Sequence, residues 1–375
     1  MTYYRWMAFR SVAVLATLAA AAAPALAQQW RMQYLYDEVK SGLTIYDIQF
    51  SSPSRGMAVG VVSQGRDEKY TALLTSDGGA HWQLSPLKEL PLSLFLLNDS
   101  AGWLVTEKGI WKTTNGGKDW GRMPKLPDKA EALRVYFADA NHGWAACANR
   151  TVLATTNGGK DWAALPETPP PMRPSANYGA FTWIGFANPQ AGIITGAADQ
   201  SRPVRLPDWL APDAAIQERE RPHPAATLQT HDGGKTWRSD RTSMLGDITR
   251  TRFAPGRRGV GLIEHSQGAR YPSDVFEIGW PNGANNLIFH DEHFFVSDVW
   301  VTPGGAYYLA GIELASKLRE IVPQKVKVLT SRDLKTWTPM AVDYRADANR
   351  VYLGGSGEDA LWLATNTGMI LKLTQ

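Results

Sequence analysis

The octapeptide Thr-Thr-Asn-Gly-Gly-Lys-Asp-Trp occupies residues 113–120, and residues 155–162 repeat it without change. Related octapeptides occupy residues 75–82 (TSDGGAHW) and 230–237 (THDGGKTW), and a copy one residue shorter occupies residues 331–337 (SRDLKTW). The Asp or Asn in the third position accepts backbone N–H bonds within a tight turn, and the glycines supply positive φ. The final Trp offers a large apolar face at the start of the next strand. We interpret this octapeptide repeat as a folding device without a catalytic role.

Each copy contributes two residues to this structural role: the Asp or Asn that forms the turn, and the final Trp. They are Asp77, Trp82, Asn115, Trp120, Asn157, Trp162, Asp232, Trp237, Asp333 and Trp337.

Three short apolar segments with the character of strands precede each copy, and the Trp opens a fourth. Four short strands per repeat correspond to one blade of a β-propeller. Counting first strands gives seven units, which begin near residues 46, 92, 133, 182, 249, 297 and 349. The predicted fold is therefore all-β: a seven-bladed β-propeller of four-stranded antiparallel blades.

The last unit ends after its third strand, at residues 368–373, so its fourth strand is missing at the C-terminus. Residues 29–36 have no blade of their own, and Trp30 matches the Trp that opens other fourth strands. We predict that this N-terminal strand completes the last blade, which closes the ring and removes both exposed edges.

The N-terminus reads as an export signal. Positive charge at Arg5 and Arg10 precedes an apolar stretch over residues 12–23, which Ala-Leu-Ala follows. We predict a signal peptide over residues 1–27 and a mature propeller over residues 28–375. The alternative, a membrane anchor, would need about 20 apolar residues. No later segment is apolar enough to span a membrane, so the prediction is an exported protein of the periplasm, or of the thylakoid lumen in a photosynthetic source.

Composition excludes several classes of function. A formal net charge of +3 is too small to indicate nucleic-acid binding. The single cysteine, Cys147, permits no internal disulfide. Scattered histidines and the lack of a phosphate loop give no reason to expect a metal or a cofactor.

The octapeptide resembles the Asp-box of BNR repeat proteins, S/T-x-D-x-G-x-x-W. Its Thr-Thr-Asn-Gly-Gly-Lys-Asp-Trp form, following Gly-Trp strands at residues 102–103 and 143–144, is similar to that of the photosynthesis system II stability/assembly factor family. The resemblance implies an exported, non-enzymatic scaffold whose partner is a protein, namely a membrane-protein complex or its assembly intermediate. Relatives of that family also occur where no photosystem is evident, so the resemblance does not name the partner.

The alternative is an enzyme, a sialidase-like glycoside hydrolase. Sialidases share Asp-boxes and use three Arg to hold a carboxylate, with a Tyr–Glu nucleophile pair and an Asp acid. The sequence lacks their Arg-Ile-Pro signature near the N-terminus, and no Tyr pairs with a Glu by position. The sequence therefore favours a protein that is not an enzyme.

Long insertions indicate where a partner would bind. The repeat turns join third and fourth strands on one face of the ring, which we call the repeat face. Insertions at residues 63–69, 197–226, 266–273 and 314–325 fall on the opposite face, the loop face, together with the Pro-rich connection at residues 166–174. Loops of this length in a compact repeat protein are commonly functional, which favours a partner surface there.

Aligning the first strands on their apolar pattern makes one position equivalent in all seven units. It is expected at the mouth of the central channel on the loop face. Arg is suited to bidentate contact with carboxylates, so the arginines could form an anion site for an acidic segment of a partner. Ion pairing between the Arg and Asp residues of the ring is the equally open alternative. The aligned residues are Asp47, Ser93, Arg134, Trp183, Arg250, Asp298 and Arg350, of which all but Ser93 are candidate partner-binding residues.

Overall fold

The computed structural model describes residues 28–148, 150–166, 179–197, 223–265, 269–279, 283–314 and 324–375. The predicted signal peptide lies outside the described residues. So do most of the insertion at 197–226 and of the connection at 166–174, and parts of the insertions at 266–273 and 314–325. The insertion at residues 63–69 is described, and it is a lengthened hairpin with its turn at Gly65 and Arg66.

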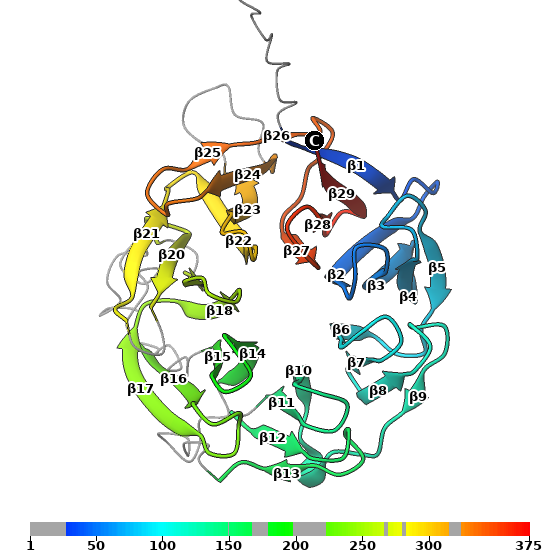
Figure 1. The fold of residues 1–375 in the computed structure, drawn as a ribbon. Coiled ribbons are helices and arrows are strands. Elements are labelled where there is room, and N and C mark those ends of the chain that lie inside the picture. The colour runs from blue at the N-terminus through cyan, green and yellow to red at the C-terminus, as the bar shows by residue number, and fades with distance from the viewer. Residues whose placement is uncertain are drawn as a thin grey trace, which may run out of the picture.

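Seven antiparallel sheets stand in a ring around a central channel, as predicted (Figure 1). Blade one consists of β2 (Gly42–Phe50), β3 (Gly56–Gln64), β4 (Asp67–Thr75) and β5 (Gln83–Pro86). Blade two consists of β6 (Pro91–Leu96), β7 (Gly102–Thr106), β8 (Gly109–Thr113) and β9 (Gly121–Arg122). The short 3₁₀ turn η1 (Pro127–Lys129) leads into blade three, which consists of β10 (Ala132–Phe137), β11 (Gly143–Cys147), β12 (Val152–Thr155) and β13 (Ala163–Ala164). Blade four consists of β14 (Ala180–Phe186), β15 (Gly192–Ala197), β16 (His223–Thr230) and β17 (Arg238–Met244). Blade five consists of β18 (Asp247–Arg252), β19 (Gly259–Glu264), β20 (Ser273–Ile278) and β21 (Asn286–His290). Blade six consists of β22 (Phe294–Val301), β23 (Tyr307–Glu313), β24 (Val326–Ser331) and β25 (Thr338–Pro339).

Blade seven joins the two ends of the chain. Its strands are β27 (Val351–Gly355), β28 (Leu361–Thr365), β29 (Met369–Thr374), β1 (Gln29–Leu35) and the short β26 (Ala341–Val342). No helix within the described ranges is long and apolar enough to cross a membrane.

The N-terminal strand closes the ring. β1 pairs antiparallel with β29 from Gln29 opposite Thr374 to Leu35 opposite Met369, which confirms the predicted closure. The Trp30 side chain is 1% exposed and packs edge-on against Tyr308 of blade six. One feature differs from the prediction: β26 pairs parallel with the first two residues of β1, so β1 lies between two strands and is not the outermost strand there.

The octapeptide repeat forms the same turn wherever it occurs. In blade two, the Asn115 side-chain oxygen accepts from the Asp119 N–H at 3.0 Å, and the Thr113 hydroxyl oxygen accepts from the Gly117 N–H at 2.9 Å. The glycine at residue 117 has φ +84°, which is strained for any other residue. In blade six Leu334 takes a positive φ of 61° in its place. These bonds use backbone groups that the turn would otherwise leave unpaired.

The repeat turn is also tied to the turn between the first and second strands of its own blade. The Gly116 N–H donates to the Ser100 carbonyl at 2.9 Å, and equivalent bonds occur in blades one, three and four. Both turns therefore lie on the repeat face. Since the first strand of a blade ends at this turn, each inner strand runs from the loop face to the repeat face.

The Trp of the repeat packs between neighbouring blades. Trp162 meets Phe137 edge-on at 6.0 Å, and Phe137 stacks on Trp103 of the preceding blade at 3.6 Å between ring centroids. Trp82, Phe50 and Trp362 build the same three-ring arrangement. Trp237, Phe186 and Trp144 build a similar one, in which Phe186 and Trp144 are tilted by 30°. Large aromatic surfaces buried between blades contribute strongly to stability.

A pair of side chains, which we call the clasp, joins the third and seventh positions of the repeat. Where the third residue is Asn, the seventh is Asp: the Asn115 amide donates to the Asp119 carboxylate at 2.8 Å. Where the third residue is Asp, the seventh is neutral or basic, as in Asp77 with His81. Backbone and side-chain hydrogen bonds from His81 lower the pKa of Asp77 to about 2. In the four full-length copies the clasp therefore pairs a donor with an acceptor and never joins two carboxylates.

We expect Asn115→Asp to lower the Tm by roughly 2 °C, because it places two carboxylates where a hydrogen bond stood. Asn115→Asp combined with Asp119→Thr should recover the wild-type Tm, because blade four pairs Asp232 with Thr236 in this way. Differential scanning calorimetry at pH 7 measures both. A Tm for the single variant equal to that of the wild type would contradict this account of the clasp.

Deleting residues 28–36 should expose the edges of β29 and β26 and remove the buried Trp30. We expect the Tm to fall by several degrees, and the amide protons of β29 that bond to β1 to exchange with solvent at least tenfold faster. Hydrogen exchange read by mass spectrometry locates the effect. Protection of β29 that is unchanged by the deletion would contradict the closing role of β1.

Candidate functional site

A β-bulge marks the aligned position in six of the seven inner strands. In blade one the pairing of β2 with β3 shifts between Ile45 and Asp47, and Asp47 then lies opposite Val59. The equivalent shift precedes the aligned residue in blades two to six. The sequence alignment is therefore confirmed for Asp47, Ser93, Arg134, Trp183, Arg250 and Asp298.

The alignment is wrong in blade seven, where Tyr352 and not Arg350 holds the equivalent position. Counting back three residues from the end of the inner strand, as from Phe50 to Asp47, leads from Gly355 to Tyr352. The pairing of β27 with β28 runs without a bulge, and β27 begins only at Val351. Because β27 lacks the bulge, its apolar residues are out of step with those of the other inner strands. The sequence alignment therefore selected Arg350, which lies two residues before the equivalent residue, Tyr352.

Arg350 lies outside the ring of aligned residues and has its own partner. Its guanidinium group forms two hydrogen bonds to the Glu264 carboxylate, one of them at 2.9 Å. Glu264 ends β19 of blade five, so the ion pair spans blade six at the loop-face rim. Arg350 is therefore a rim residue that ties two blades together.

Four of the aligned side chains, one each in blades one, two, four and six, bond to the inner strand of the next blade. The inner strand of each blade borders the channel with an edge that has no neighbouring strand (Figure 1). Ser93 donates to the Leu133 carbonyl at 2.8 Å, and the Trp183 indole N–H donates to the Thr251 carbonyl at 2.9 Å. Unpaired backbone groups that are buried destabilise a fold, so these side chains stabilise the inner edges.

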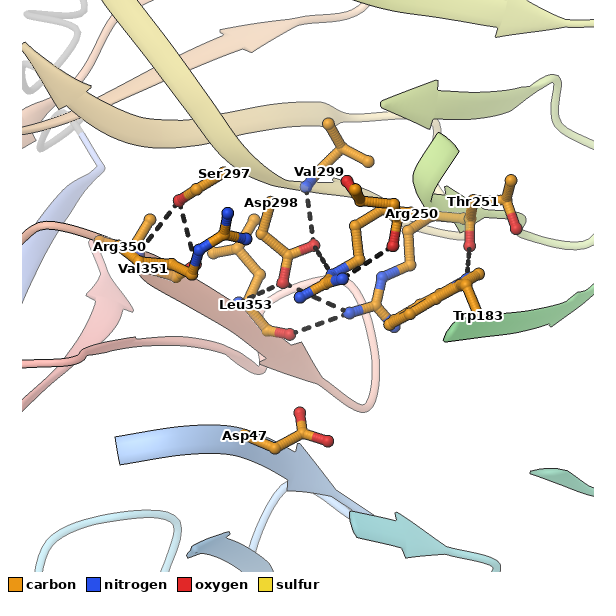
Figure 2. Close-up of polar contacts among 12 residues, drawn as sticks. Asp47, Trp183, Arg250, Thr251, Ser297, Asp298, Val299, Arg350, Val351 and Leu353 are labelled. Atoms are coloured by element: carbon orange, nitrogen blue, oxygen red, sulfur yellow. Dashed lines mark hydrogen bonds and ion pairs between the residues drawn. The ribbon is translucent and has the colours of Figure 1, made fainter. Parts of the chain in front are cut away.

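The two aspartates accept hydrogen bonds in the same manner. Asp47 accepts from the Leu94 N–H at 3.1 Å, and Asp298 accepts from the Leu353 N–H at 2.9 Å. Each also accepts from the N–H of the residue that follows it, Ile48 or Val299. Backbone donors of the inner strands therefore already occupy both oxygens of each carboxylate. Figure 2 shows the two bonds to Asp298, from Val299 and Leu353.

Trp183 is the centre of the channel mouth. Its ring is 4% exposed, and three guanidinium groups lie over it: Arg134 at 4.3 Å, Arg250 at 4.6 Å and Arg252 at 4.8 Å from the ring centroid. Figure 2 shows Trp183 beside Arg250. Cation–π contacts with a desolvated Trp are each worth about 2 kcal/mol. Trp183 thus holds together three like charges that would otherwise repel each other.

Two aspartates offset the charge of the three arginines. Arg134 pairs with Asp47 at 3.1 Å, while Asp298 lies 3.7 Å from Arg250 and 3.6 Å from Arg252. We call these six residues, including Trp183, the belt. Burial lowers the pKa of Arg134 and of Arg252, and the nearby aspartates act in the opposite direction. Three guanidinium groups against two carboxylates leave the belt with one surplus positive charge.

The expectation that Arg134, Arg250 and Arg350 converge on a common anion is wrong. Arg350 lies at the rim, and the other two are paired with the ring aspartates, which was the open alternative. Sequence reasoning also missed Arg252. The available signal was its spacing: side chains two residues apart on a strand share a face, so Arg252 follows Arg250 into the channel.

The belt does not offer the groups that a glycoside hydrolase needs. Such an enzyme uses one carboxyl group as a proton donor and a second as a base or nucleophile. Asp47 and Asp298 instead accept backbone N–H bonds and arginine contacts with their oxygens. Among the residues that the structure describes, no three metal-ligating side chains form a group that could hold a metal ion.

The fold and the belt together define a closed seven-bladed β-propeller whose channel mouth is filled by charged and aromatic side chains. The same fold occurs in the solved structure "YCF48 bound to D1 peptide", which is 16% identical with a TM-score of 0.61 and covers 92% of this chain and 96% of that chain. YCF48 from Cyanidioschyzon merolae is 16% identical with a TM-score of 0.60, over 92% of this chain and 98% of that one.

A streptogramin B lyase shares the fold as well, at 10% identity and a TM-score of 0.56, over 92% of this chain and 97% of that chain. The chain thus has the fold of the YCF48 propellers, and at these identities the likeness extends to the fold alone. No protein-family model and no curated protein matches the chain.

Asp298→Asn should lower the free energy of unfolding by about 3–5 kcal/mol, because it leaves Arg250 and Arg252 buried without a countercharge. Adding Arg252→Gln to this variant should restore part of the loss, since it removes one of the uncompensated charges. Urea unfolding measures both, with Asp67→Asn on the exposed hairpin as the control. A single variant within about 0.5 kcal/mol of the wild type would show that the belt is not an electrostatic unit.

Proposed function

We propose that the protein is an exported, non-catalytic scaffold that binds a protein partner on its loop face. Its role would be the assembly or maintenance of an envelope membrane complex. The observation that carries the proposal is the fold, which matches over 92% of the chain a YCF48 structure described as bound to D1 peptide. The resemblance of the octapeptide repeat to that of the photosynthesis system II stability/assembly factors supports the same function.

The loop face suits this role because the repeat face is occupied by structural turns. There, repeat turns bond to the turns between first and second strands in blades one to four. On the loop face, the β3–β4 hairpin extends beyond the shorter β7–β8 hairpin of blade two, and the rim carries the Arg350–Glu264 pair. The other insertions are predicted to fall on this face, and most of their residues lie outside those that the structure describes.

The belt would support partner binding by holding the mouth in a fixed shape. Its arginines and aspartates are paired with each other, and its Trp is buried, so these residues position the rim. A pre-formed surface binds with less loss of conformational freedom than a mobile one. A role in the partner interface itself stays a prediction for Arg134, Arg250, Arg350, Asp47, Asp298 and Trp183.

The proposed binding face can be tested with photo-crosslinking amino acids. Arg66 and Lys108 lie in hairpins on the loop face, whereas Lys118 and Lys160 lie in repeat turns, and all four side chains are exposed. We expect crosslinks to one membrane-protein partner from Arg66 and Lys108, at least tenfold more abundant than those from Lys118 and Lys160. Mass spectrometry of crosslinked cell envelopes identifies the partner and the face.

Two outcomes would contradict the proposal. Equal crosslinking from both faces would show that the loop face is not a specific surface. Release of the fluorophore from a sialoside reporter, by purified protein at a rate above that of an Asp298→Asn variant, would show an enzyme instead of a scaffold.

A further inference from the structure

A cavity of about 200 Å³ lies inside the channel, and all seven blades contribute to its lining. Three belt residues, Arg134, Trp183 and Arg252, border it, and the other lining residues of blades three and four come later on the inner strands. Because the inner strands run from the loop face to the repeat face, the cavity lies on the repeat side of the belt. It is therefore separate from the proposed partner surface.

Seven of the lining residues, one from each blade, lie two residues beyond the aligned position. Side chains at this spacing share a face of the strand, so they form a second tier below the belt. The tier consists of Gln49, Phe95, Tyr136, Gly185, Arg252, Trp300 and Gly354, and every one of these residues lines the cavity. Three of the seven are aromatic, so much of the cavity wall is flat and apolar.

Arg252 brings positive charge to this aromatic wall. Its guanidinium group lies 4.8 Å from the Trp183 ring centroid and 4.6 Å from that of Trp300. Its side chain is 21% exposed, against 12% for Arg134 and for Arg250, so Arg252 is the most accessible arginine of the belt.

The hydrogen-bonding capacity of Arg252 is incompletely used. One of its nitrogens donates to the Leu353 carbonyl at 3.2 Å, and it shares Asp298 with Arg250 at distances beyond 3.5 Å. Within the described part of the chain, its buried Nε has no hydrogen-bond partner. The surplus charge of the belt is thus centred on Arg252, and a buried charge without compensation is costly.

Tyr136 adds a neutral hydrogen-bond donor to the same wall. Burial raises the pKa of its phenol to about 12, so the hydroxyl stays protonated at neutral pH. A protonated phenol can donate to an anion, whereas a phenolate would repel it.

We propose that the cavity binds a small carboxylic acid with a flat apolar group, an aryl carboxylate of the size of benzoate. The carboxylate would accept from Arg252 and offset the surplus charge, and the ring would pack against Trp300 and the other aromatic side chains. A volume of about 200 Å³ is below the ~300–1,000 Å³ of sites for drug-sized ligands, so the ligand is small.

Other ligand classes fit this lining less well. A metal cation or an amine would meet the surplus positive charge of the belt. An inorganic anion would satisfy Arg252 but leave the aromatic wall in contact with water. A neutral aromatic compound would cover the wall without compensating the charge. The carboxylate and the ring are therefore both required.

Isothermal titration calorimetry of the full chain with benzoate, benzamide and acetate tests both requirements. We expect benzoate to bind with a stoichiometry of one, and benzamide and acetate to bind at least tenfold more weakly. Benzamide has the same shape without the charge, and acetate has the charge without the ring. Benzamide that binds as tightly as benzoate would overturn the charge argument, and sulfate that displaces benzoate with equal affinity would show an adventitious ion only.

Arg252→Gln should weaken benzoate binding at least tenfold, whereas Arg66→Gln, which removes an arginine on the exposed hairpin, should leave it unchanged. Trp300→Leu should weaken benzoate binding but not acetate binding. If Arg252→Gln does not fold, Arg252→Lys keeps the charge without the planar fork and should weaken binding severalfold. Wild-type affinity in a folded Arg252 variant would overturn the proposal. Crosslinking on the loop face tests partner binding and calorimetry tests benzoate binding, so one proposal can fail while the other holds.

Discussion

The inner edge of each blade is the constraint on which the rest of this structure depends. A four-stranded blade covers its inner strand on one side only, and the other side borders the channel with backbone groups that no strand can pair. Side chains of the preceding blade bond to them, as Ser93 does to the Leu133 carbonyl and Asp298 to the Leu353 N–H. The β-bulge places the aligned side chain at the same height in six blades, and four of these side chains make such a bond. The channel mouth is therefore polar for a structural reason.

This origin of the polar mouth explains why a functional reading based on residue type alone fails there. Arginines at the aligned position look available for an incoming carboxylate, yet Arg134 already has Asp47 and Arg250 lies by Asp298. Once these pairs are formed, the belt still carries one positive charge more than it has carboxylates, because Arg252 is a third arginine beside two aspartates. Arg252 lies on the cavity side of the belt. The belt itself separates the rim, on the side of the loops, from the aromatic cavity, on the side of the repeat turns.

Much of the fold follows from the sequence because the octapeptide repeat and the Trp30 match are local signals. The blade count, the closing strand and six aligned positions could all be predicted from them. The aligned residue of blade seven could not, because β27 lacks the bulge that sets the apolar pattern elsewhere. The partners of the arginines could not be predicted either, since Asp47 and Arg134 come from blades one and three and meet only when these blades have packed around the channel. The parallel contact of β26 with β1 has no sequence signal of its own.

The position of β1 has a consequence for the order in which the molecule folds. Blades one to six are each built from neighbouring segments and can form as the chain emerges. Blade seven must wait, because the Thr374 hydroxyl and the Gln29 carbonyl that it joins are 345 residues apart in the chain. The entropic cost of closing so long a loop grows only slowly with its length, but the search for such a distant partner is slow. Blade seven can therefore be built only by the complete chain, and β29 keeps an unpaired edge until β1 reaches it.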